Sequence, residues 1–172
     1  MTKKIDVEVS ALLDKLANDL TPLLAIHPVI IGIHTGGSWL AEILHERLAI
    51  KEPCGSLDIS FYRDDFSRIG LNPEVKASNI PLDISDRHIL LIDDVLQTGR
   101  TVRAAMNEIF DYGRPASIRL CVLVTRNGHE LPIQADYCGM TLDLRTDQQV
   151  KLVGPEKLSL VVGDLAAGNN QS

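Results

Sequence analysis

The stretch "ILLIDDVLQTGRT", residues 89–101, begins as an apolar run, continues with two aspartates and ends in a turn rich in threonine and glycine. A continuous apolar run of this kind is typical of a central parallel strand that is covered on both faces. In open α/β sheets, ligands bind at the carboxyl ends of such strands. We therefore expect Asp93 and Asp94 to lie at a ligand site, where they need not be buried.

Strand and helix patterns alternate on both sides of this stretch. Leucines at spacings of three and four predict an amphipathic helix over residues 9–25, bent or ended near Pro22. A second helix is expected to follow the glycine-rich "HTGGS", and a third to start after Thr101 and stop at Gly113. This alternation predicts a single α/β domain with a doubly wound, mainly parallel sheet. The other expected strands are "PVIIGI" (28–33), "SLDISFY" (56–62), "SIRLCVLVT" (117–125) and "ADYCGM" (135–140).

Length and composition indicate a single globular domain. The chain has 172 residues, of which 45% are hydrophobic, so a sizeable core needs neither a metal nor a disulfide. Cys54, Cys121 and Cys138 are widely spaced and contain no CxxC pair, which favours reduced, structural thiols. No signal-like or membrane-spanning run is present, so we expect a cytoplasmic protein. A net charge of -6 argues against broad attraction to nucleic acid, although a local basic patch is compatible with it.

The turn after the two aspartates has the features of a phosphate site. Backbone N–H groups at the start of a helix, together with the hydroxyls of Thr98 and Thr101, suit an anion. Gly99 lets the backbone approach that anion, and Arg100 adds positive charge. Carboxylates beside a phosphate repel it unless they face sugar hydroxyls or a metal ion, so the pattern predicts a phosphorylated sugar with Mg²⁺. The alternative is that one aspartate merely caps the helix.

Two segments are expected to lack regular structure. The polar stretch over residues 63–86 reads as a lid loop, an added hairpin, a disordered segment or a passive excursion. Residues 165–172 read as a flexible tail. Trp39 lies on the apolar side of its helix and is expected to be a core residue rather than a ligand platform.

The thirteen residues from Ile89 to Thr101 resemble the signature of type I phosphoribosyltransferases, which has four hydrophobic residues, two acids and a phosphate turn. The resemblance extends from about residue 28 to residue 142. It is closest to the PyrR branch, which comprises pyrimidine-operon regulators with uracil phosphoribosyltransferase activity. The further matching motifs are "DISFYRDDFS" (58–67), "DDVLQTGRTVRAAM" (93–106), "GRPASI" (113–118) and "ELPIQADYCG" (130–139).

The resemblance implies a fold, a reaction and a set of partners. It implies the type I phosphoribosyltransferase fold with a small base-binding hood and a mobile lid. The implied reaction converts uracil and phosphoribosyl pyrophosphate (PRPP), with Mg²⁺, into UMP and pyrophosphate. Two alternatives stay open: an RNA-binding regulator of pyrimidine genes with little catalysis, and a transferase for another base. A homo-oligomer is expected from the family.

The resemblance also assigns roles to residues of this chain. Asp93 and Asp94 are the expected catalytic acids, which face the ribose hydroxyls and can contribute to the magnesium site. Arg63 would belong to the lid, and Arg126 to the base and RNA region. Gln97 stands where purine-specific relatives usually carry an acid, which argues against a purine. The remaining substrate-binding residues would be Thr35, Gly36 and Gly37 for the pyrophosphate, through a strained or cis peptide; Val95, Leu96, Gln97, Thr98, Gly99, Arg100 and Thr101 for the 5-phosphate; and Tyr137, Cys138 and Gly139 for the base.

The chain departs from the PyrR pattern in two places. The pyrophosphate loop reads Thr35-Gly36-Gly37 instead of Thr-Arg-Gly, so an expected cation toward the pyrophosphate is missing. Arg63, Arg68 and His34 are the candidates to replace it. The segment at residues 125–129 reads Thr-Arg-Asn-Gly-His instead of Asp-Arg-Gly-His-Arg, which weakens the expectation of RNA binding.

Overall fold

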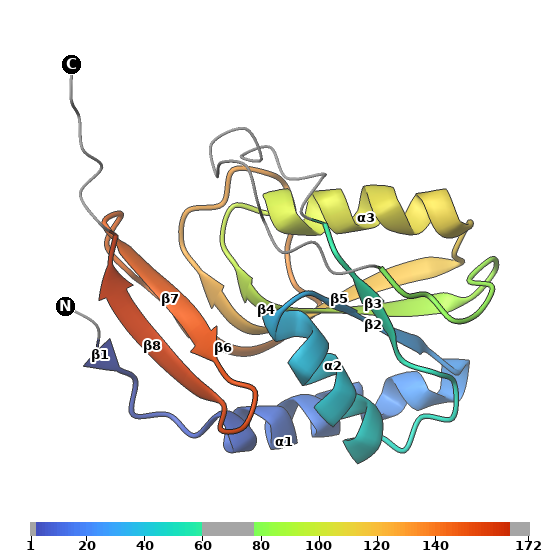
Figure 1. The fold of residues 1–172 in the computed structure, drawn as a ribbon, viewed down its shortest axis with the longest axis horizontal. Helices are drawn as coiled ribbons and strands as arrows, with labels where there is room; N and C mark the ends of the chain where they lie inside the picture. The colour runs from blue at the N-terminus through green and yellow to red at the C-terminus, as the bar shows by residue number, and fades with distance from the viewer. Residues whose placement is uncertain (1–2, 60–77, 166–172) are drawn as a thin grey trace.

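The computed structural model describes residues 3–59 and 78–165, which form two sheets and the helices that cover them (Figure 1). The larger sheet has five parallel strands in the order β3-β2-β4-β5-β6, and the smaller has three antiparallel strands in the order β1-β8-β7. This confirms the predicted doubly wound α/β fold. The strands and helices are β1 (Lys3–Lys4), α1 (Val9–Leu20), β2 (Val29–Ile33), α2 (Gly36–Arg47), β3 (Gly55–Leu57), β4 (His88–Leu96), α3 (Arg100–Tyr112), β5 (Ser117–Arg126), β6 (Tyr137–Leu142), β7 (Gln148–Val153) and β8 (Ser159–Asp164).

Strand β4 lies at the centre of the larger sheet, and both of its faces are buried. Leu90 and Ile92 point toward the core under α1 and α2, whereas Ile89 and Leu91 point toward the core under α3. Figure 1 shows α3 on one side of the sheet and the other two helices on the opposite side. Because side chains alternate along a strand, only a continuously apolar run can fill both cores.

Helix α1 buries its leucine stripe and ends where proline removes a backbone donor. Leu13, Leu16 and Leu20 are buried at spacings of three and four. Pro22 stands at the start of a 3₁₀ helix, Thr21–Ile26, that continues the chain after α1. Proline suits the first turn of such a segment because its missing N–H has no acceptor there. The predicted helix that bends or ends near Pro22 is confirmed.

The residues of the smaller sheet did not predict it. It was expected only because the family resemblance implies a small hood. Val150, Leu152 and Leu160 of β7 and β8 are buried against the α1 and α2 side of the core. At the end of β7, a Cβ atom on Gly154 would lie 3.0 Å from two ring atoms of Trp39. The hood is therefore packed tightly onto the first turns of α2.

The described part of the predicted lid segment is joined to the body of the fold. Asn79 forms an antiparallel bridge with Ser56, next to β3, and Ile84 is buried. Residues 60–77, which contain most of the predicted lid, and residues 166–172 of the predicted tail lie outside the described residues. Leu165 donates its N–H to the carbonyl of Asp147 at 2.6 Å. The lid itself stays a prediction.

The cysteines are free thiols, as expected. Burial raises the pKa of Cys121 to about 12, so this thiol stays protonated and unreactive at neutral pH. Within the described ranges, no helix is long and apolar enough to cross a membrane.

A buried acid anchors the segment that follows residue 77. Glu108 of α3 is only 6% exposed, and one of its carboxylate oxygens accepts a hydrogen bond from the hydroxyl of Ser78. The other, Oε2, has no hydrogen-bond partner among the described residues. Burial, with the nearby charges of Asp58 and Asp111, raises the pKa of Glu108 above its ordinary value of 4.5. Between pH 4.5 and this raised pKa, the native protein therefore holds a proton here that the unfolded chain has lost.

Because Glu108 must lose this proton as the pH rises, we expect the free energy of unfolding to fall from pH 4.5 through the raised pKa of Glu108. Glu108→Gln keeps an oxygen for Ser78 and removes the titration, so its melting temperature should fall less over this pH range. Thermal unfolding between pH 4.5 and 7.5 measures the difference, with exposed Glu46→Gln as the control. An equal decline in wild type and Glu108→Gln would contradict the assignment.

Candidate active site

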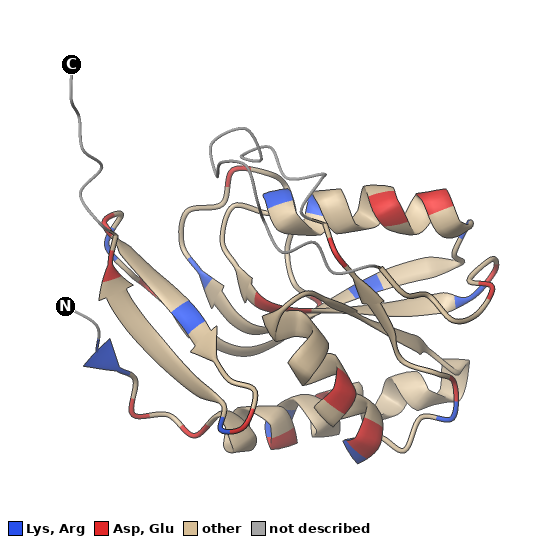
Figure 2. Ribbon diagram, viewed as in Figure 1, with Lys and Arg blue, Asp and Glu red and all other residues tan. Residues whose placement is uncertain are grey.

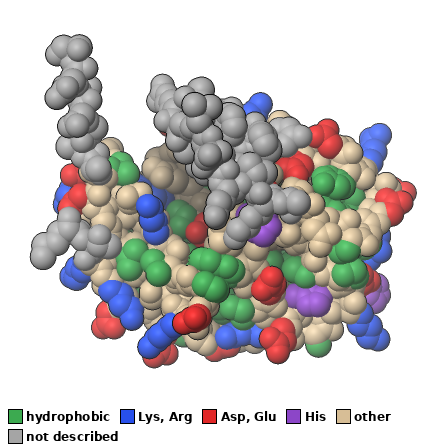
Figure 3. Space-filling model, viewed as in Figure 1, with side chains coloured by type: hydrophobic (Ala, Val, Ile, Leu, Met, Phe, Trp, Pro, Cys, Tyr) green, Lys and Arg blue, Asp and Glu red, His purple; other side chains and the backbone are tan. Residues whose placement is uncertain are grey.

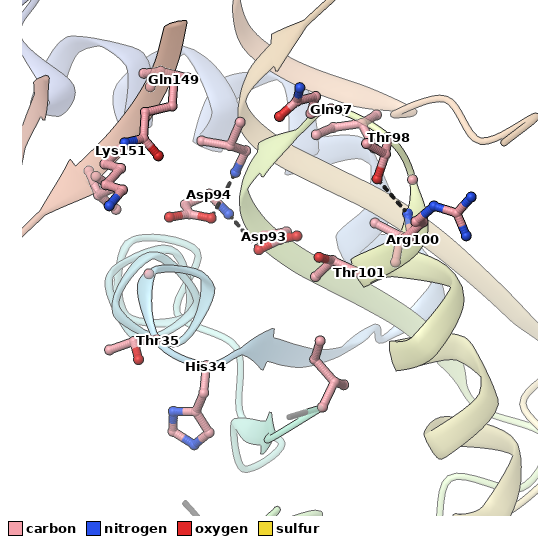
Figure 4. Close-up of a pocket in the computed structure, with 18 of the residues that line it drawn as sticks. His34, Thr35, Asp93, Asp94, Gln97, Thr98, Arg100, Thr101, Gln149 and Lys151 are labelled. Atoms are coloured by element: carbon pink, nitrogen blue, oxygen red, sulfur yellow. Dashed lines mark hydrogen bonds between the residues drawn. The ribbon is translucent and has the colours of Figure 1, made fainter. Parts of the chain in front are cut away.

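A pocket of about 830 Å³ opens at the carboxyl ends of β2 and β4, where ligands bind in open α/β sheets (Figure 4). Among the described residues, most of its walls come from the loop from β2 into α2, the end of β4 with the turn into α3, and strand β7 of the hood. Ile59 and Glu130 complete the described lining. The loop and the turn each lead into a helix N-terminus, so two sets of backbone N–H groups face one cavity.

The two aspartates lie on β4 at the floor of the pocket. Asp93 is only 4% exposed, so the expectation that neither acid need be buried is wrong for this residue. The reason is that β4 continues to Leu96 and pairs Asp93 with Val122 of β5. An oxygen of Asp93 accepts the N–H of Asp94 at 2.9 Å, and an oxygen of Asp94 accepts the N–H of Val95 at 2.8 Å. These bonds fix both carboxylates.

The turn between β4 and α3 is held in place by its neighbours. Gly99 has φ +89°, and a Cβ atom here would lie 3.3 Å from the Cβ atoms of Leu131 and Ile133. The carbonyl of Thr98 accepts the N–H groups of Glu130 at 3.1 Å and of Leu131 at 3.0 Å. Glycine is required because of both the backbone angle and the close approach. The segment 130–133 thus braces the turn from behind.

Helix α3 begins without an aspartate cap. Gly99 occupies the N-cap position, and no side chain caps the helix. The alternative that Asp93 or Asp94 merely caps this helix is therefore wrong. The N–H of Arg100, the first of the helix, donates to the Thr98 hydroxyl at 3.2 Å (Figure 4). The next first-turn N–H groups of a helix lack intrahelical acceptors, which suits them to an anion. Thr101 lies in this first turn and lines the pocket, as predicted.

Arg100 reaches the pocket but already has an acidic partner. Its Nε donates to an oxygen of Glu130 at 2.6 Å, and both side chains are about half exposed. The positive charge that the sequence assigned to the phosphate is therefore shared with Glu130, a pocket residue that the analysis of the sequence did not single out. Its position in "ELPIQADYCG" gave no sign of this contact.

The loop into α2 contains the cis peptide that the resemblance implies, between His34 and Thr35. Thr35 and Gly36 line the pocket. A Cβ atom on Gly36 would meet the side chain of Asp94, at 2.8 Å from Cγ and 2.9 Å from Cβ. Gly37 does not line the pocket, because it faces the backbone of β4: its Cβ would lie 2.5 Å from the carbonyl oxygen of Ile92.

Arg126, predicted to bind substrate, does not line the pocket and is only 3% exposed. Its guanidinium donates to the backbone carbonyls of Asn127 at 3.2 Å, Gln148 at 2.6 Å and Arg145 at 3.3 Å. All three acceptors are fixed backbone oxygens, which suits an arginine fork. Arg126 therefore clamps the end of β5 to the start of the hood.

Tyr137 and Cys138 do not line the pocket either. The register of β6 pairs Tyr137 with Cys121, in the middle of β5 and away from the carboxyl end of the sheet. Tyr137 packs against the core on the α1 side. The sulfur of Cys138 contacts the Thr125 hydroxyl at 3.3 Å and the Met140 carbonyl at 3.0 Å. Predicted Arg63 lies outside the described residues.

The wall formed by β7 and the ring of Trp39 were missed as parts of the site. Trp39 packs against the core, as expected, but it also lines the pocket. The alternation in "QVKLV" indicates a half-buried strand and was the available signal for β7. The β7 residues that line the pocket are Gln149, Val150, Lys151 and Leu152.

Comparison with known proteins agrees with this geometry. Residues 5–160 match the family model described as the phosphoribosyl transferase domain. The chain belongs to the phosphoribosyltransferase family. The bifunctional protein PyrR of Nitrosococcus oceani is 52% identical to this phosphoribosyltransferase over 164 residues, which cover 92% of this chain and 93% of the relative. PyrR of Pseudomonas paraeruginosa is 54% identical over 153 residues, 87% and 90% of the two chains.

Solved phosphoribosyltransferases share its fold. A hypoxanthine-guanine-xanthine phosphoribosyltransferase superposes with a TM-score of 0.64 at 19% identity and covers 98% of both chains. The purine phosphoribosyltransferase of Pyrococcus horikoshii superposes with a TM-score of 0.58 at 24% identity, over 78% of this chain and 82% of the other. At such identities the likeness establishes the fold alone, so the base must be argued from the site.

Proposed function

We propose that this phosphoribosyltransferase joins uracil to the phosphoribosyl group of PRPP, which yields UMP and pyrophosphate. The observation that supports it best is the meeting, in one pocket, of the acid pair Asp93 and Asp94 with two helix-start loops. A sugar that carries an anion at each end fits this arrangement. The turn over residues 95–101 would hold the 5-phosphate, the acids would face the ribose, and the loop of Thr35 and Gly36 would hold the pyrophosphate.

The reaction needs little covalent help from the protein. Nitrogen N1 of uracil attacks C1 of the ribose while the bond from C1 to the pyrophosphate oxygen breaks, and the electrons of that bond leave with pyrophosphate. The proton of N1 passes to a pyrophosphate oxygen or to water. Positive charge builds on the ribose in the transition state, and fixed carboxylates on the pocket floor stabilise it.

The residues of the pocket fit a magnesium ion that is shared with the substrate. Asp93 and Asp94 offer carboxylate oxygens, which Mg²⁺ prefers, and PRPP offers further oxygens. Within the described ranges, no group of three or more His, Cys, Asp or Glu residues could hold a metal by itself. Bound with PRPP, the ion would neutralise the charge that develops on the leaving pyrophosphate.

We place the base against β7 rather than against β6. Strand β7 is the edge of the hood, paired with β8 on one side only. The carbonyl of Gln148 points away from β8, since it accepts from Arg126. The N–H and C=O groups of Val150 and Leu152 then lie on this free edge by alternation. Such an edge matches the alternating carbonyl and N–H groups of uracil, and Gln97, an amide, lies in the same pocket.

The alternative of an RNA-binding regulator has less support from the charges. Arg100 and Arg119 pair with Glu130 and Asp136, and Arg126 is buried. Figure 2 shows basic and acidic residues interspersed along the ribbon, and Figure 3 shows no broad basic area on the face in view. RNA binding, a homo-oligomeric state and a cytoplasmic location stay predictions.

The proposal is tested by measuring the pyrophosphate released from PRPP in the presence of Mg²⁺ and one base at a time. The bases are uracil, orotate, hypoxanthine, guanine and xanthine. We expect uracil to give the highest kcat/KM, because one strand edge and an amide suit its small ring. A hydrophobic contact alone separates similar ligands by about 10–200-fold, so some activity with another base is compatible with the proposal. A purine with a higher kcat/KM than uracil would contradict it.

A further inference from the structure

The charge of the pocket does not suit its proposed substrate without a further cation. PRPP carries several negative charges, and the described walls already contain Asp93, Asp94 and Glu130. Arg100 is paired with Glu130, and it lies at the 5-phosphate end of the pocket. Arg100 therefore balances Glu130, and the pyrophosphate end, with Asp93 and Asp94 nearby, needs a cation of its own.

That cation cannot come from position 36 in this arrangement. The three atoms nearest to a Cβ on Gly36 all belong to the side chain of Asp94, so an arginine here would displace the carboxylate. The loop of Thr35 and Gly36 offers backbone N–H groups but no lysine or arginine side chain. His34 is bound to the Ser38 hydroxyl through Nδ1 at 3.1 Å.

Lys151 reaches the pocket from strand β7 of the hood. The buried side chains of Val150 and Leu152 fix the strand on either side of it, so its own side chain points out of the core. Three residues later, Gly154 packs on Trp39, which lies one turn into α2. Figure 4 shows Lys151 on the side of the pocket where Asp94 and Thr35 lie, across from Thr98 and Arg100. No ion pair or hydrogen bond joins its ammonium to another described residue.

We infer that Lys151 is the cation that binds the pyrophosphate group of PRPP and replaces the arginine missing at position 36. This inference rests on the proposed reaction, and it assigns a positioning role at the leaving group. The contact between Lys151 and pyrophosphate also explains why PRPP can bind although position 36 is a glycine. The Lys151 side chain is exposed and long, so it can follow the substrate as it enters and as pyrophosphate leaves.

Binding measurements with and without the pyrophosphate group test this role. Isothermal titration calorimetry would measure the Kd for PRPP, with Mg²⁺ and without a base, and in a separate titration the Kd for UMP. The proteins compared are wild type, Lys151→Met, Lys151→Arg and Lys157→Met, an exposed control from the same hairpin. We expect Lys151→Met to raise the Kd for PRPP about tenfold, because a charged hydrogen bond is lost. The Kd for UMP should change less than about twofold, since UMP lacks pyrophosphate. Lys151→Arg should retain most of the affinity, and Lys157→Met all of it.

Two outcomes would overturn the inference. An unchanged Kd for PRPP in Lys151→Met would show that the lysine makes no contact with the pyrophosphate. An equal loss for PRPP and UMP would place Lys151 at a shared part of the ligand or reveal a general structural effect. Wild type that binds PRPP but transfers no phosphoribosyl group to uracil would contradict the proposed base and leave this inference standing. Wild type that fails to bind PRPP would contradict both.

Discussion

Asp94→Asn is expected to lower kcat by about 10²- to 10³-fold, the usual effect of removing one fixed electrostatic group from an active site. The carboxylate lies on the pocket floor and accepts the N–H of Val95 at 2.8 Å. The asparagine oxygen can accept the same bond, so the end of β4 should keep its shape. What is lost is the negative charge that stabilises the ribose as positive charge develops on it.

Kinetics and thermal unfolding of the same preparations separate these effects. The melting temperature of Asp94→Asn should stay within a few degrees of wild type, because no buried bond is broken. Asp143→Asn, at an exposed position on the loop after β6, is the matched control and should change neither quantity. A loss of stability as large as the loss of turnover would show that Asp94 supports the fold rather than the reaction.

Gly37→Ala is expected to destabilise the fold by about 1–3 kcal/mol, the usual cost of overpacking a buried site. The added methyl group would lie 2.5 Å from the carbonyl oxygen of Ile92 and 3.1 Å from Cα of Asp93. Both atoms belong to the backbone of the central strand, which cannot rotate away. The first turn of α2 would have to move away from β4, and the pocket floor would move with it.

Gly36→Ala, one residue earlier, is the variant to compare with Gly37→Ala. Here the methyl group meets only the side chain of Asp94 among its three nearest atoms, and a side chain can rotate. The variant should fold with nearly the stability of wild type but turn over more slowly, because its catalytic carboxylate is displaced. Denaturant unfolding and kcat, measured for both variants, test the contrast. Equal stability of the two variants would contradict the close packing of α2 against β4.

The fold was predictable because its central features are local in the sequence. The apolar run of β4 can be satisfied only between two helical layers, and Pro22 and Gly113 mark where helices end. The shape of the turn into α3 was also predictable, since it depends on a few consecutive residues around Gly99. The binding of a phosphate by Thr98 and Thr101 stays a prediction.

The wall against which we propose that the base binds was not predictable in the same way, because it depends on register and on long-range packing. Tyr137 resembles a base-stacking residue in sequence, but its pairing with Cys121 holds it in mid-sheet. Arg126 looks like a ligand contact, yet three backbone carbonyls from other segments enclose it. Lys151 carries no motif, and only the packing of Gly154 on Trp39 brings β7 to the pocket.

Conversion of ring-labelled uracil to UMP by the purified protein, with PRPP and Mg²⁺, tests the central claim most directly. The account predicts that label appears in UMP in equal amount to the pyrophosphate released, and that Asp94→Asn forms UMP at a small fraction of the wild-type rate. Label that stays in uracil, under conditions in which the protein binds both PRPP and UMP, would contradict the claim that this pocket catalyses phosphoribosyl transfer to uracil.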